Sequence, residues 1–511
     1  MLEKFLLSID QGTTGTKVVL FDQQGEVRAS SYKKHTQYYT KPGWTEHDPE
    51  EIWACIGQGI QEALAEGKIE PSQIEAIGLA NQGETVLFWD DQGRPLYPAI
   101  VWSCRRSQAI AREWEAQEGW SAKVFHKTGL RIDPYFSATK IRWMMEEVEQ
   151  VQGHIRDGSA RCSTLDSWLI WKMTGGRSFV TDPSTAARTM LYNTRLGEWD
   201  QEILEYLEID AAWLPSILPT AGHFGITSKD ALCGIEAPIR VSIVDQPAAL
   251  YGHLCTEPGT SKCTYGTGCF VYMNIGSELP DQPTASLLST IVWSKDDNVT
   301  YALDGAIYSA GSTVDWAMNE LALFSSIDEL QAWSTEWYHR LLNAGGEYDR
   351  DANLWFAPCL SGAGAPYWNS DFRGLFLGLS HGTSKKEMAK AVLEGIAHRV
   401  ADVIDEMQQV SMHPVTVLRV DGGLTANAYL MQYQADLLGI PVEVPGSAET
   451  TALGTAYLTG EACGWWTTKQ LRRKVPITHT FHPRLDAADR EALRGEWARI
   501  MQLMTRFYSK G

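Results

Sequence analysis

The stretch "LLSIDQGTTGTKVVLFD", residues 6–22, sets a loop rich in glycine and threonine between two short apolar runs. The runs at 5–9 and 17–22 have the length of strands, and "EVRASSYKKHTQ" after the turn "DQQG" can form a third. We therefore expect an antiparallel meander with the glycine loop at a hairpin tip. A Walker A loop and a dinucleotide-binding fingerprint would each be followed by a helix, so both are excluded here.

The composition of this loop favours phosphate binding. Gly12 and Gly15 have no Cβ, so their backbone amides can approach an anion, and Thr13 and Thr14 add hydroxyl donors. Asp10 ends the first strand and points at the same space, where a carboxylate would repel phosphate unless a cation lay between them. A Mg²⁺ ion is therefore expected at Asp10. The alternative is a plain tight hairpin that binds nothing.

The opening pattern returns near residue 259, where "GTSKCTYGTGCFVYMNIGSEL" again has the pattern strand, glycine–threonine turn, strand. This repeat predicts one fold used twice, in domains 1–252 and 253–511, with the boundary near 250–258. Helical and strand-like patterns alternate in both halves, which is typical of α/β domains. Helices are expected at 49–67, through much of 139–175, from the capping-box pair Ser384 and Glu387 onward, and at 428–438; strands are expected at 74–80 and 416–420.

Two turns in the second half are further candidates for a nucleotide site. "TYGTG", residues 264–268, repeats the first hairpin tip, and two facing tips could hold different phosphates of one nucleotide. "DGG", residues 421–423, lies between a strand and a helix whose first amides are free for an anion, and Asn427 could reach the nucleoside. Each turn taken alone is equally compatible with an ordinary tight turn.

Asp245 is the candidate catalytic base. It ends the apolar strand in "VSIVDQPAAL" and precedes a helix. The carboxyl end of a buried strand is where active sites of α/β proteins lie, and phosphoryl transfer needs an acceptor for the proton of the attacking hydroxyl. A helix N-cap is the alternative role for this aspartate.

Composition limits the function further. The 511 residues exceed one ordinary domain, and 44% hydrophobic residues are ample for a buried core. A net charge of −19 without a dense basic cluster argues against nucleic acid as a partner. The nine cysteines show no paired spacing, the N-terminus lacks the pattern of a signal peptide, and no apolar run is long enough to span a membrane. We expect a cytoplasmic protein.

Taken together, several motifs resemble the FGGY carbohydrate kinases over residues 4 to about 466. The resemblance is carried, in this order, by "DQGTTGTK", "NQGET", "TGLRIDPYFSATK", "DSWLIWKMTGG", "TDPSTAARTMLYN", "DQPAALYG", "TYGTGCF", "GAGAPYW", "RGLFLGL" and "LRVDGGLTANAYLMQYQADLLG". It implies a duplicated actin-like (ribonuclease-H-like) α/β fold with ATP in a central cleft. The implied reaction is ATP-dependent phosphorylation of a small polyol or sugar, with glycerol, giving glycerol 3-phosphate, as the favoured acceptor.

The resemblance also implies roles for particular residues. Asp245 would be the general base and Asp10 would lie in the Mg²⁺ region. The residues around ATP would be Thr13, Thr14, Gly266, Thr267, Gly311, Gly423 and Asn427. The residues around the acceptor would be Gly83, Glu84, Tyr135, Asp245 and Gln246, with Trp102 and Phe270 covering the carbon chain. Carboxylates and aromatic walls suit a small polyol, which is polar at each oxygen and apolar on its C–H faces.

Two departures from the family pattern leave the acceptor open. Gly83 stands where the family carries arginine in "NQRET", and Cys104 replaces the aspartate of a W-x-D-x-R motif. Another acceptor, such as a tetritol, a pentitol or a ketose like xylulose, is therefore an alternative, unless Arg105 or Arg106 takes the place of the missing arginine. A non-catalytic actin-like sensor is a remote alternative, which the intact Asp10 and Asp245 oppose. A homodimer or homotetramer is compatible with the exposed C-terminal helical region.

Overall fold

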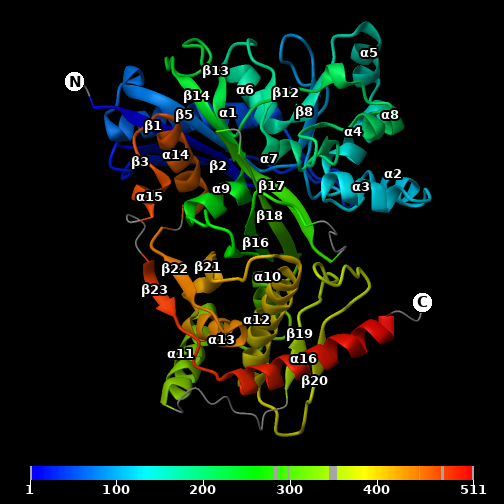
Figure 1. The fold of residues 1–511 in the computed structure, drawn as a ribbon, viewed down its shortest axis with the longest axis vertical. Coiled ribbons are helices and arrows are strands. Elements are labelled where there is room, and N and C mark those ends of the chain that lie inside the picture. The colour runs from blue at the N-terminus through cyan, green and yellow to red at the C-terminus, as the bar shows by residue number, and fades with distance from the viewer. Residues whose placement is uncertain are drawn as a thin grey trace.

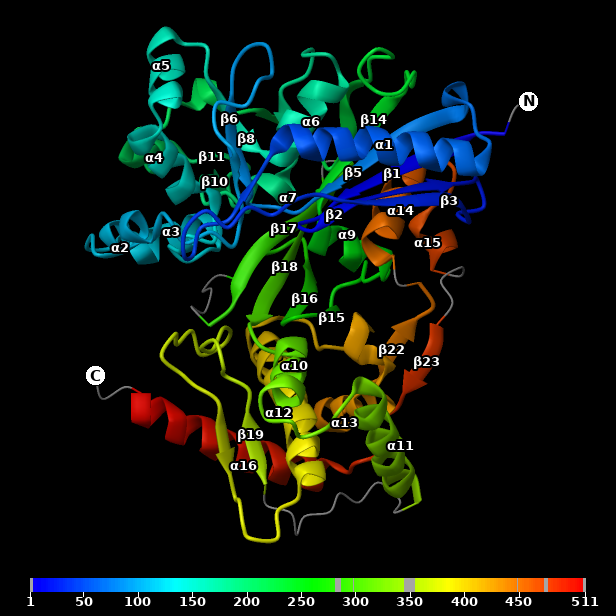
Figure 2. The same ribbon diagram turned by 180° about the vertical axis from the view of Figure 1, so that it is seen from behind.

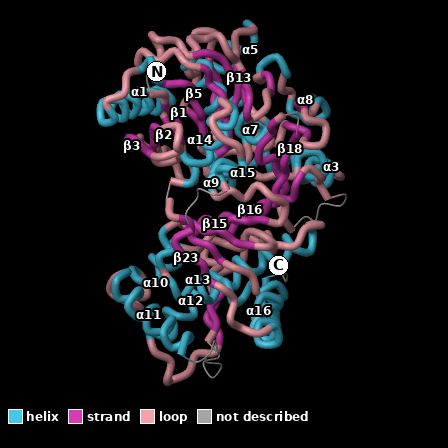
Figure 3. The backbone as a smooth tube through the Cα atoms, turned by 60° about the vertical axis from the view of Figure 1, so that its left-hand side comes forward, coloured by secondary structure: helices cyan, strands magenta, loops and turns pink. Residues whose placement is uncertain are grey.

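The chain folds into two lobes that are stacked along its long axis, as Figures 1 and 2 show from opposite sides. The structure, a computed structural model, describes residues 3–280, 286–296, 298–343, 354–447, 449–472 and 477–508. Each lobe is built around one large mixed β-sheet. Strands β15 and β16 lie at the waist between the lobes in the tube drawing of Figure 3.

The sheet of the first lobe has the strand order β13-β14-β5-β1-β2-β3. The first three strands form the meander expected from the sequence, because β1 pairs antiparallel with β2 and β2 with β3, while β5 and β14 continue the sheet in parallel with β1. The bounds are β1 Phe5–Gln11, β2 Gly15–Phe21, β3 Val27–Lys34, β5 Ile74–Asn81, β13 Ala221–Ile226 and β14 Pro238–Val244.

The sheet of the second lobe repeats this arrangement in the order β17-β18-β16-β15-β21-β22-β23. Strand β15 pairs antiparallel with β16 and β16 with β18, β17 lies at the edge beyond β18, and β21 and β22 extend the sheet in parallel from β15. The expectation of a duplicated fold is therefore confirmed. The bounds are β15 Thr260–Tyr265, β16 Cys269–Gly276, β17 Leu288–Lys295, β18 Asn298–Ile307, β21 Val417–Asp421, β22 Val442–Pro445 and β23 Ile477–Phe481.

The sequence of β1 explains why helices cover both faces of the first sheet. Side chains alternate between the faces of a strand, and nearly all of β1 is buried. Phe5, Leu7 and Ile9 join the core that contains the apolar face of α1 (Pro49–Gly67). Leu6 instead joins the core that contains α14 (Thr450–Ala462). The strand is therefore buried between a helix from early in the chain and a helix from late in the chain.

Helix α14 makes a close backbone contact with α9 (Asp245–Gly252), and the two helices lie side by side in Figure 1. A Cβ on Gly454 would lie 1.9 Å from the carbonyl oxygen of Ala248, and a Cβ on Gly252 would lie 2.0 Å from that of Thr450. Glycine is therefore required on both helices for this spacing. Because α9 begins at Asp245, this contact also fixes the position of that residue.

Helix signals in the sequence match the observed helix ends. Asp48 caps α1 by accepting the N–H of Glu50, and Ser384 and Glu387 form the expected capping box of α12 (Lys385–Val410). The expected helical stretch at 139–175 is interrupted by one strand, β8 (Arg161–Thr164), which pairs with β6 (Val86–Trp89). The break follows Gly158, the left-handed C-cap of α5 (Glu149–Asp157).

The remaining elements surround the two sheets. Strands β4 (Glu46–His47) and β7 (Ala99–Ile100) form a four-stranded sheet with β6 and β8. The other short strands are β9 Val180–Thr181, β10 Tyr192–Asn193, β11 Glu198–Trp199, β12 Ser216–Ile217, β19 Trp355–Ala357 and β20 Leu375–Leu377. The other α-helices are α2 Gln108–Glu115, α3 Trp120–Thr128, α4 Ser137–Glu147, α6 Leu165–Met173, α7 Pro183–Ala186, α8 Gln201–Leu207, α10 Gly311–Asn319, α11 Ile327–Asn343, α13 Ala428–Leu438, α15 Thr468–Leu471 and α16 Ala487–Tyr508.

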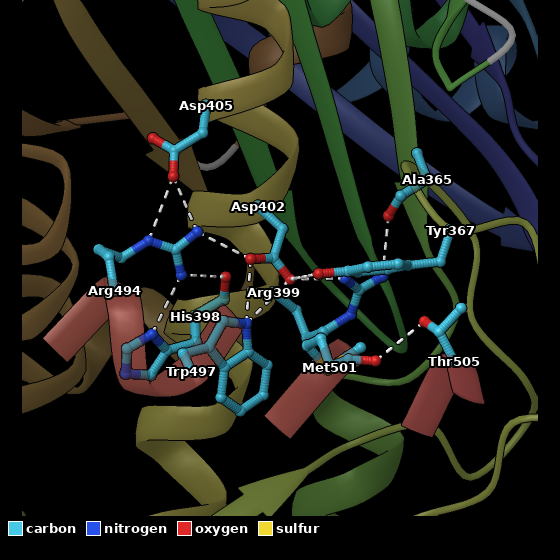
Figure 4. A network of polar contacts seen from close by, with 10 residues as sticks. All are labelled: Ala365, Tyr367, His398, Arg399, Asp402, Asp405, Arg494, Trp497, Met501 and Thr505. Carbon is cyan, nitrogen blue, oxygen red and sulfur yellow. Dashed lines mark hydrogen bonds and ion pairs between the residues drawn. The ribbon is translucent and has the colours of Figure 1, made fainter. Parts of the chain in front are cut away.

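The C-terminal helix α16 is held on α12 by the polar network of Figure 4. The Arg494 guanidinium donates to Asp402 at 2.7 Å and to Asp405 at 2.8 Å, and the indole N–H of Trp497 donates to Asp402 at 3.0 Å. Arg399 donates to the same Asp402 at 2.8 Å. The last helix is therefore an integral part of the second lobe. Within the described residues, no helix combines the length and apolar character needed to cross a bilayer.

Candidate functional site

The first hairpin tip, residues 12–14, lies beside an aromatic residue of the expected acceptor wall. The indole N–H of Trp102 donates to the Thr13 hydroxyl at 2.9 Å, and the Thr14 hydroxyl lies 3.2 Å from that of Tyr32. The Gly12 amide donates to the Gly15 carbonyl at 3.0 Å, so this amide is occupied by the hairpin itself. The Thr13 and Thr14 hydroxyls and the other backbone amides of the tip stay candidate phosphate donors.

Gly15 is required by the packing of its strand, a reason that the sequence did not suggest. A Cβ at this position would lie 2.4 Å from the carbonyl oxygen of Lys33 on the neighbouring strand β3. Glycine therefore allows the close approach of two strands. The expectation that it serves anion binding is not needed to explain it.

Asp10 lies next to this tip in an excess of negative charge. Burial, and then the carboxylates of Asp245 and Glu449, raise the pKa of Asp10 to about 8, although Lys17 opposes the rise. Lys17 itself is bound to Glu449 at 2.9 Å. Asp10 and Asp245, predicted from separate motifs, are therefore neighbours, and their mutual repulsion is what a bound cation would relieve.

Asp245 is the first residue of α9, and Val244, not Asp245, occupies the N-cap position. The Asp245 carboxylate accepts the N–H of Gln246 at 2.6 Å. Burial raises the pKa of Asp245, and the nearby ammonium group of Lys262 is the strongest influence opposing that rise. The side chain is thus a partly buried carboxylate with a cation close by, which suits a proton acceptor.

Lys262 is a fully buried lysine on β15 that the sequence analysis did not select. Its ammonium group donates to the Gln246 carboxamide oxygen and, at 2.9 Å, to the Thr264 hydroxyl. It therefore links the second hairpin to the first turn of α9. The sequence signal was present, since Lys262 is the one charged residue in that strand.

The expected acceptor residues of the first lobe gather around Glu84. The Tyr135 and Trp102 rings meet edge to face with centroids 5.5 Å apart. Burial raises the pKa of Glu84 to about 7. The Asp245 carboxylate is near enough to contribute to this rise. Phe270 lies on β16, half-buried, paired with Thr264. Carboxylates and aromatic rings thus occur together, as a polyol site requires.

Gly83 lies in a turn that glycine suits. Its φ is +62°, its N–H donates to the Asn81 side chain at 3.0 Å, and a Cβ would lie 3.1 Å from Cγ1 of Val244. Each of the two arginines that could take over from an arginine at this position already has a carboxylate partner. Arg106 is buried and paired with Glu46 at 2.7 Å, and Arg105 is paired with Asp133 at 3.0 Å.

Cys104 departs from the family pattern without leaving its arginine unpaired. The Arg106 Nε donates to the Cys104 Sγ at 3.0 Å, and the same guanidinium lies over the Trp44 ring at 4.1 Å. Glu46 supplies the carboxylate that position 104 lacks. The buried arginine therefore keeps a carboxylate partner in spite of the departure.

The second hairpin tip, residues 266–268, meets two other predicted nucleotide-binding segments. The Gly311 amide donates to the Gly266 carbonyl at 2.9 Å, and the Ser312 hydroxyl donates to the Thr267 carbonyl at 3.0 Å, so the N-terminus of α10 meets this tip. A Cβ on Gly422 would lie 2.3 Å from the Tyr265 carbonyl, which brings the 421–423 turn against the same hairpin. Around Gly423, by contrast, there is open space for a Cβ.

Asn427 has a structural role in addition to the one expected. It is buried, its carboxamide oxygen caps α13 by accepting the N–H of Leu430 at 3.0 Å, and its amide donates to the Ser334 hydroxyl at 2.8 Å. A 3₁₀ turn, Gly423–Ala426, separates it from the 421–423 turn. Its contact with a nucleoside stays a prediction.

The 421–423 turn is anchored by side chains that the sequence analysis did not use. Asp421 accepts from His253 at 2.8 Å and from Thr450 at 2.7 Å, and these hydrogen bonds help to hold its pKa below the usual range despite burial. His253 follows α9 and Thr450 begins α14. The turn of the second lobe is thus bound to the helices that pack on the first.

Two sheets of repeated arrangement, each with a glycine–threonine hairpin, and a carboxylate at the start of α9 are the features of an actin-like phosphotransferase fold. Residues 5–252 match the N-terminal domain of the FGGY family of carbohydrate kinases, and residues 261–463 match its C-terminal domain. The chain belongs to the FGGY family of carbohydrate kinases, enzymes that use ATP.

Individual relatives agree with this assignment. The chain is 43% identical to a glycerol kinase of Carboxydothermus hydrogenoformans over 98% of both chains, and 43% identical to glycerol kinase 2 of Thermotoga maritima over 97% of both. The crystal structure of Plasmodium falciparum glycerol kinase with ADP superposes with a TM-score of 0.89 at 31% identity over 98% of both chains. A xylulose kinase of Lactobacillus acidophilus, 22% identical, shares the fold with a TM-score of 0.86 over 99% of both chains.

Proposed function

We propose that this kinase transfers the γ-phosphoryl group of ATP to glycerol, forming glycerol 3-phosphate. The observation that carries the proposal is the hydrogen bond from Trp102 to Thr13, which joins the acceptor wall to the first phosphate tip. A hydroxyl held against Trp102 and Tyr135 would lie beside a phosphoryl group held at that tip. The relatives named above, which are glycerol kinases, support glycerol as the acceptor.

In this proposal, each residue has a defined task. Asp245 accepts the proton of the attacking hydroxyl, which is the chemical help that phosphoryl transfer needs beyond positioning and charge neutralisation. Glu84, Tyr135 and Gln246 bind hydroxyl groups, and Trp102 and Phe270 cover the C–H faces of the acceptor. Gly83 contributes backbone only.

ATP would bind between the two hairpin tips. Thr13 and Thr14 would contact the terminal phosphates, and Gly266, Thr267, Gly311, Gly423 and Asn427 would surround the rest of the nucleotide. The described residues contain no cluster of three or more metal-ligating side chains. Mg²⁺ fits the crowded carboxylate of Asp10 if phosphate oxygens and water complete its coordination, and it would neutralise phosphate charge there.

The test is ADP release by the purified protein with a panel of acceptors: glycerol, dihydroxyacetone, erythritol, threitol, ribitol and xylulose. We expect glycerol to give the highest kcat/KM. If a longer polyol or xylulose gives a higher kcat/KM than glycerol, that compound and not glycerol is the acceptor. Absence of ADP release with every acceptor, despite ADP binding, would favour the non-catalytic sensor.

Gly83 supports a second candidate function, the phosphorylation of an acceptor longer than glycerol. Such an acceptor would fill the volume that an arginine side chain at position 83 would occupy. Gly83→Arg is then expected to shift kcat/KM toward glycerol by roughly 10–100-fold, because one charged hydrogen bond contributes ~1.5–3 kcal/mol. The left-handed backbone at this position should also destabilise the variant by about 1–2 kcal/mol. Gly83→Ala is the control, since it adds the backbone strain without the guanidinium. A wild type that already prefers glycerol, together with an inactive Gly83→Arg, would contradict the larger pocket.

The two lobes are expected to close on ATP and acceptor together, because closure excludes the water that would otherwise accept the phosphoryl group. Small-angle scattering should show a smaller radius of gyration when a non-hydrolysable ATP analogue and glycerol are both present than with either alone. ATP hydrolysis without acceptor should be slow. An unchanged radius with both sites saturated would contradict closure.

Further parts of the proposal concern organisation. We propose residues 1–252 and 253–511 as the two domains, with α14 of the second completing the packing of the first sheet. We also propose a homodimer or homotetramer in the cytoplasm. An association surface on α16 is supported by Leu503 and Phe507, which lie four positions apart and are exposed by 54% and 73%.

A further inference from the structure

Arg188 is a buried arginine at the centre of a charged network that the assigned site residues do not explain. Its Nε donates to the Glu84 carboxylate at 2.6 Å, and another guanidinium nitrogen donates to Asp304 at 3.0 Å. All three side chains are at least 95% buried. Asp304 also accepts the hydroxyl of Tyr272 at 3.1 Å.

The three charged residues come from different parts of the fold. Glu84 follows β5 of the first sheet, Arg188 follows the short helix α7, and Asp304 lies on β18 of the second sheet. A buried guanidinium between two carboxylates therefore connects the two sheets directly. Removing one member of such a group leaves a buried charge unpaired, so each of the three side chains depends on the other two.

The environment of Arg188 also connects it to the acceptor wall. Its guanidinium carbon lies 5.7 Å from the centre of the Tyr135 ring and 5.3 Å from that of Phe136. The Glu84 backbone has φ +40°, which residues with a side chain rarely adopt, and its carbonyl accepts the Ser137 hydroxyl at 2.9 Å. Strain of this kind persists where surrounding contacts hold a functional residue in place.

We propose that Arg188 is a positioning residue of the acceptor site: it holds the Glu84 carboxylate in the orientation that binds an acceptor hydroxyl and ties it, through Asp304, to the second sheet. The inference rests on the proposed function, in which Glu84 binds the acceptor. In this proposal, Arg188 is the charged partner that fixes the Glu84 carboxylate. Binding of the acceptor is thereby linked to the relative position of both sheets.

The network predicts a pH signature. Burial raises the pKa of Glu84 to about 7, with Arg188 as the main opposing influence. An ionised carboxylate accepts a hydroxyl hydrogen bond better than a protonated one, so acceptor affinity should be present above this pKa and lost as pH falls through it. The titratable groups that face Glu84 are Arg188, Asp245, Lys140, Tyr135 and Tyr272. Removing the Arg188 charge should move the inflection to higher pH.

The experiment measures KM for the acceptor and kcat from pH 6 to 9 in wild type, Arg188→Gln and Arg188→Lys. It uses the acceptor that the wild type phosphorylates, so failure of glycerol as a substrate is seen separately in the wild type. For Arg188→Gln we expect KM to rise by roughly 30-fold or more at neutral pH, with its inflection at higher pH and ADP binding unchanged. Arg188→Lys keeps the positive charge, so the acceptor KM and its pH inflection should both lie closer to the wild-type values.

Arg399→Gln is the matched control, because Arg399 is equally buried and bound to Asp402 at 2.8 Å, away from the acceptor. It should lower the melting temperature without moving the KM inflection. If Arg188→Gln does not fold, Asp304→Asn tests the proposal instead. It keeps the shape of the side chain but removes the carboxylate that binds Arg188. The pH inflection of the acceptor KM should move in this variant. An unmoved KM and inflection in the folded variant would overturn the proposal.

Discussion

Asparagine in place of Asp245 is expected to lower kcat by ~10²–10⁴-fold, the range that general-base catalysis contributes. Asparagine keeps the size of the side chain and can still accept the N–H of Gln246, so the first turn of α9 should persist. It cannot accept the proton of the attacking hydroxyl. Isothermal titration with ADP should show unchanged affinity, which separates loss of chemistry from loss of the nucleotide site.

Asp328→Asn provides the control, because Asp328 is an exposed aspartate in the first turn of α11. It removes one carboxylate from the start of a helix without touching the site, and we expect wild-type turnover. Turnover of Asp245→Asn within a few-fold of that control would contradict the assignment of Asp245 as the base.

The second large effect is expected from Gly454→Ala. Its methyl group would lie 1.9 Å from the Ala248 carbonyl and 2.6 Å from the Gly252 amide, and both are backbone atoms that cannot move aside alone. Overpacking of this kind typically lowers the free energy of unfolding by ~1–3 kcal/mol. Because the clash is with backbone, we expect a loss of about 3 kcal/mol in this variant. Because α14 would be pushed from α9, kcat should fall as well.

Gly153→Ala is the matched control for this substitution. Gly153 also lies within a helix, α5, but apart from its chain neighbours and the backbone of that helix, no described atom lies within 4 Å of the position its Cβ would take. Alanine should stabilise that helix by about 1 kcal/mol. Thermal melting and kcat of both variants test the contact. A Gly454→Ala protein as stable and as active as the Gly153→Ala protein would contradict close packing of the two helices.

The duplicated fold could be predicted because its signal is local. Each lobe opens with two short apolar runs around a glycine–threonine tip, and a strand follows the tip, as in β1–β2 and β15–β16. The signals for helix ends are equally local. The capping box at Ser384 lies at the start of α12, and a glycine directly follows α13. Such features depend on neighbouring residues and can be read from one sequence.

The charged network around the site could not be predicted in the same way. Glu84 and Arg188 are 104 positions apart, and Arg188 and Asp304 are 116 apart, so no spacing rule relates them. Lys262 lies in a buried strand, where its partner Gln246 comes from a different element. Pairings of this kind are set by tertiary packing, which local sequence does not encode.

Glycines illustrate the same limit at single positions. Gly15 was expected to admit an anion, which stays a prediction, and its absent Cβ also makes room for the Lys33 carbonyl of the adjacent strand. Gly454 drew no attention within its helical pattern, yet it controls the spacing of α9 and α14. The reason for a glycine depends on what approaches it, and that neighbour is often remote in sequence.

The most direct test of phosphoryl transfer to glycerol is ³¹P nuclear magnetic resonance of the purified protein with ATP, Mg²⁺ and glycerol. We expect loss of the γ-phosphate signal and growth of ADP signals, with an equal amount of one phosphomonoester whose shift matches glycerol 3-phosphate. The same mixture without glycerol should change slowly. Release of inorganic phosphate alone, or a phosphomonoester that forms with xylulose or a longer polyol but not with glycerol, would contradict the account.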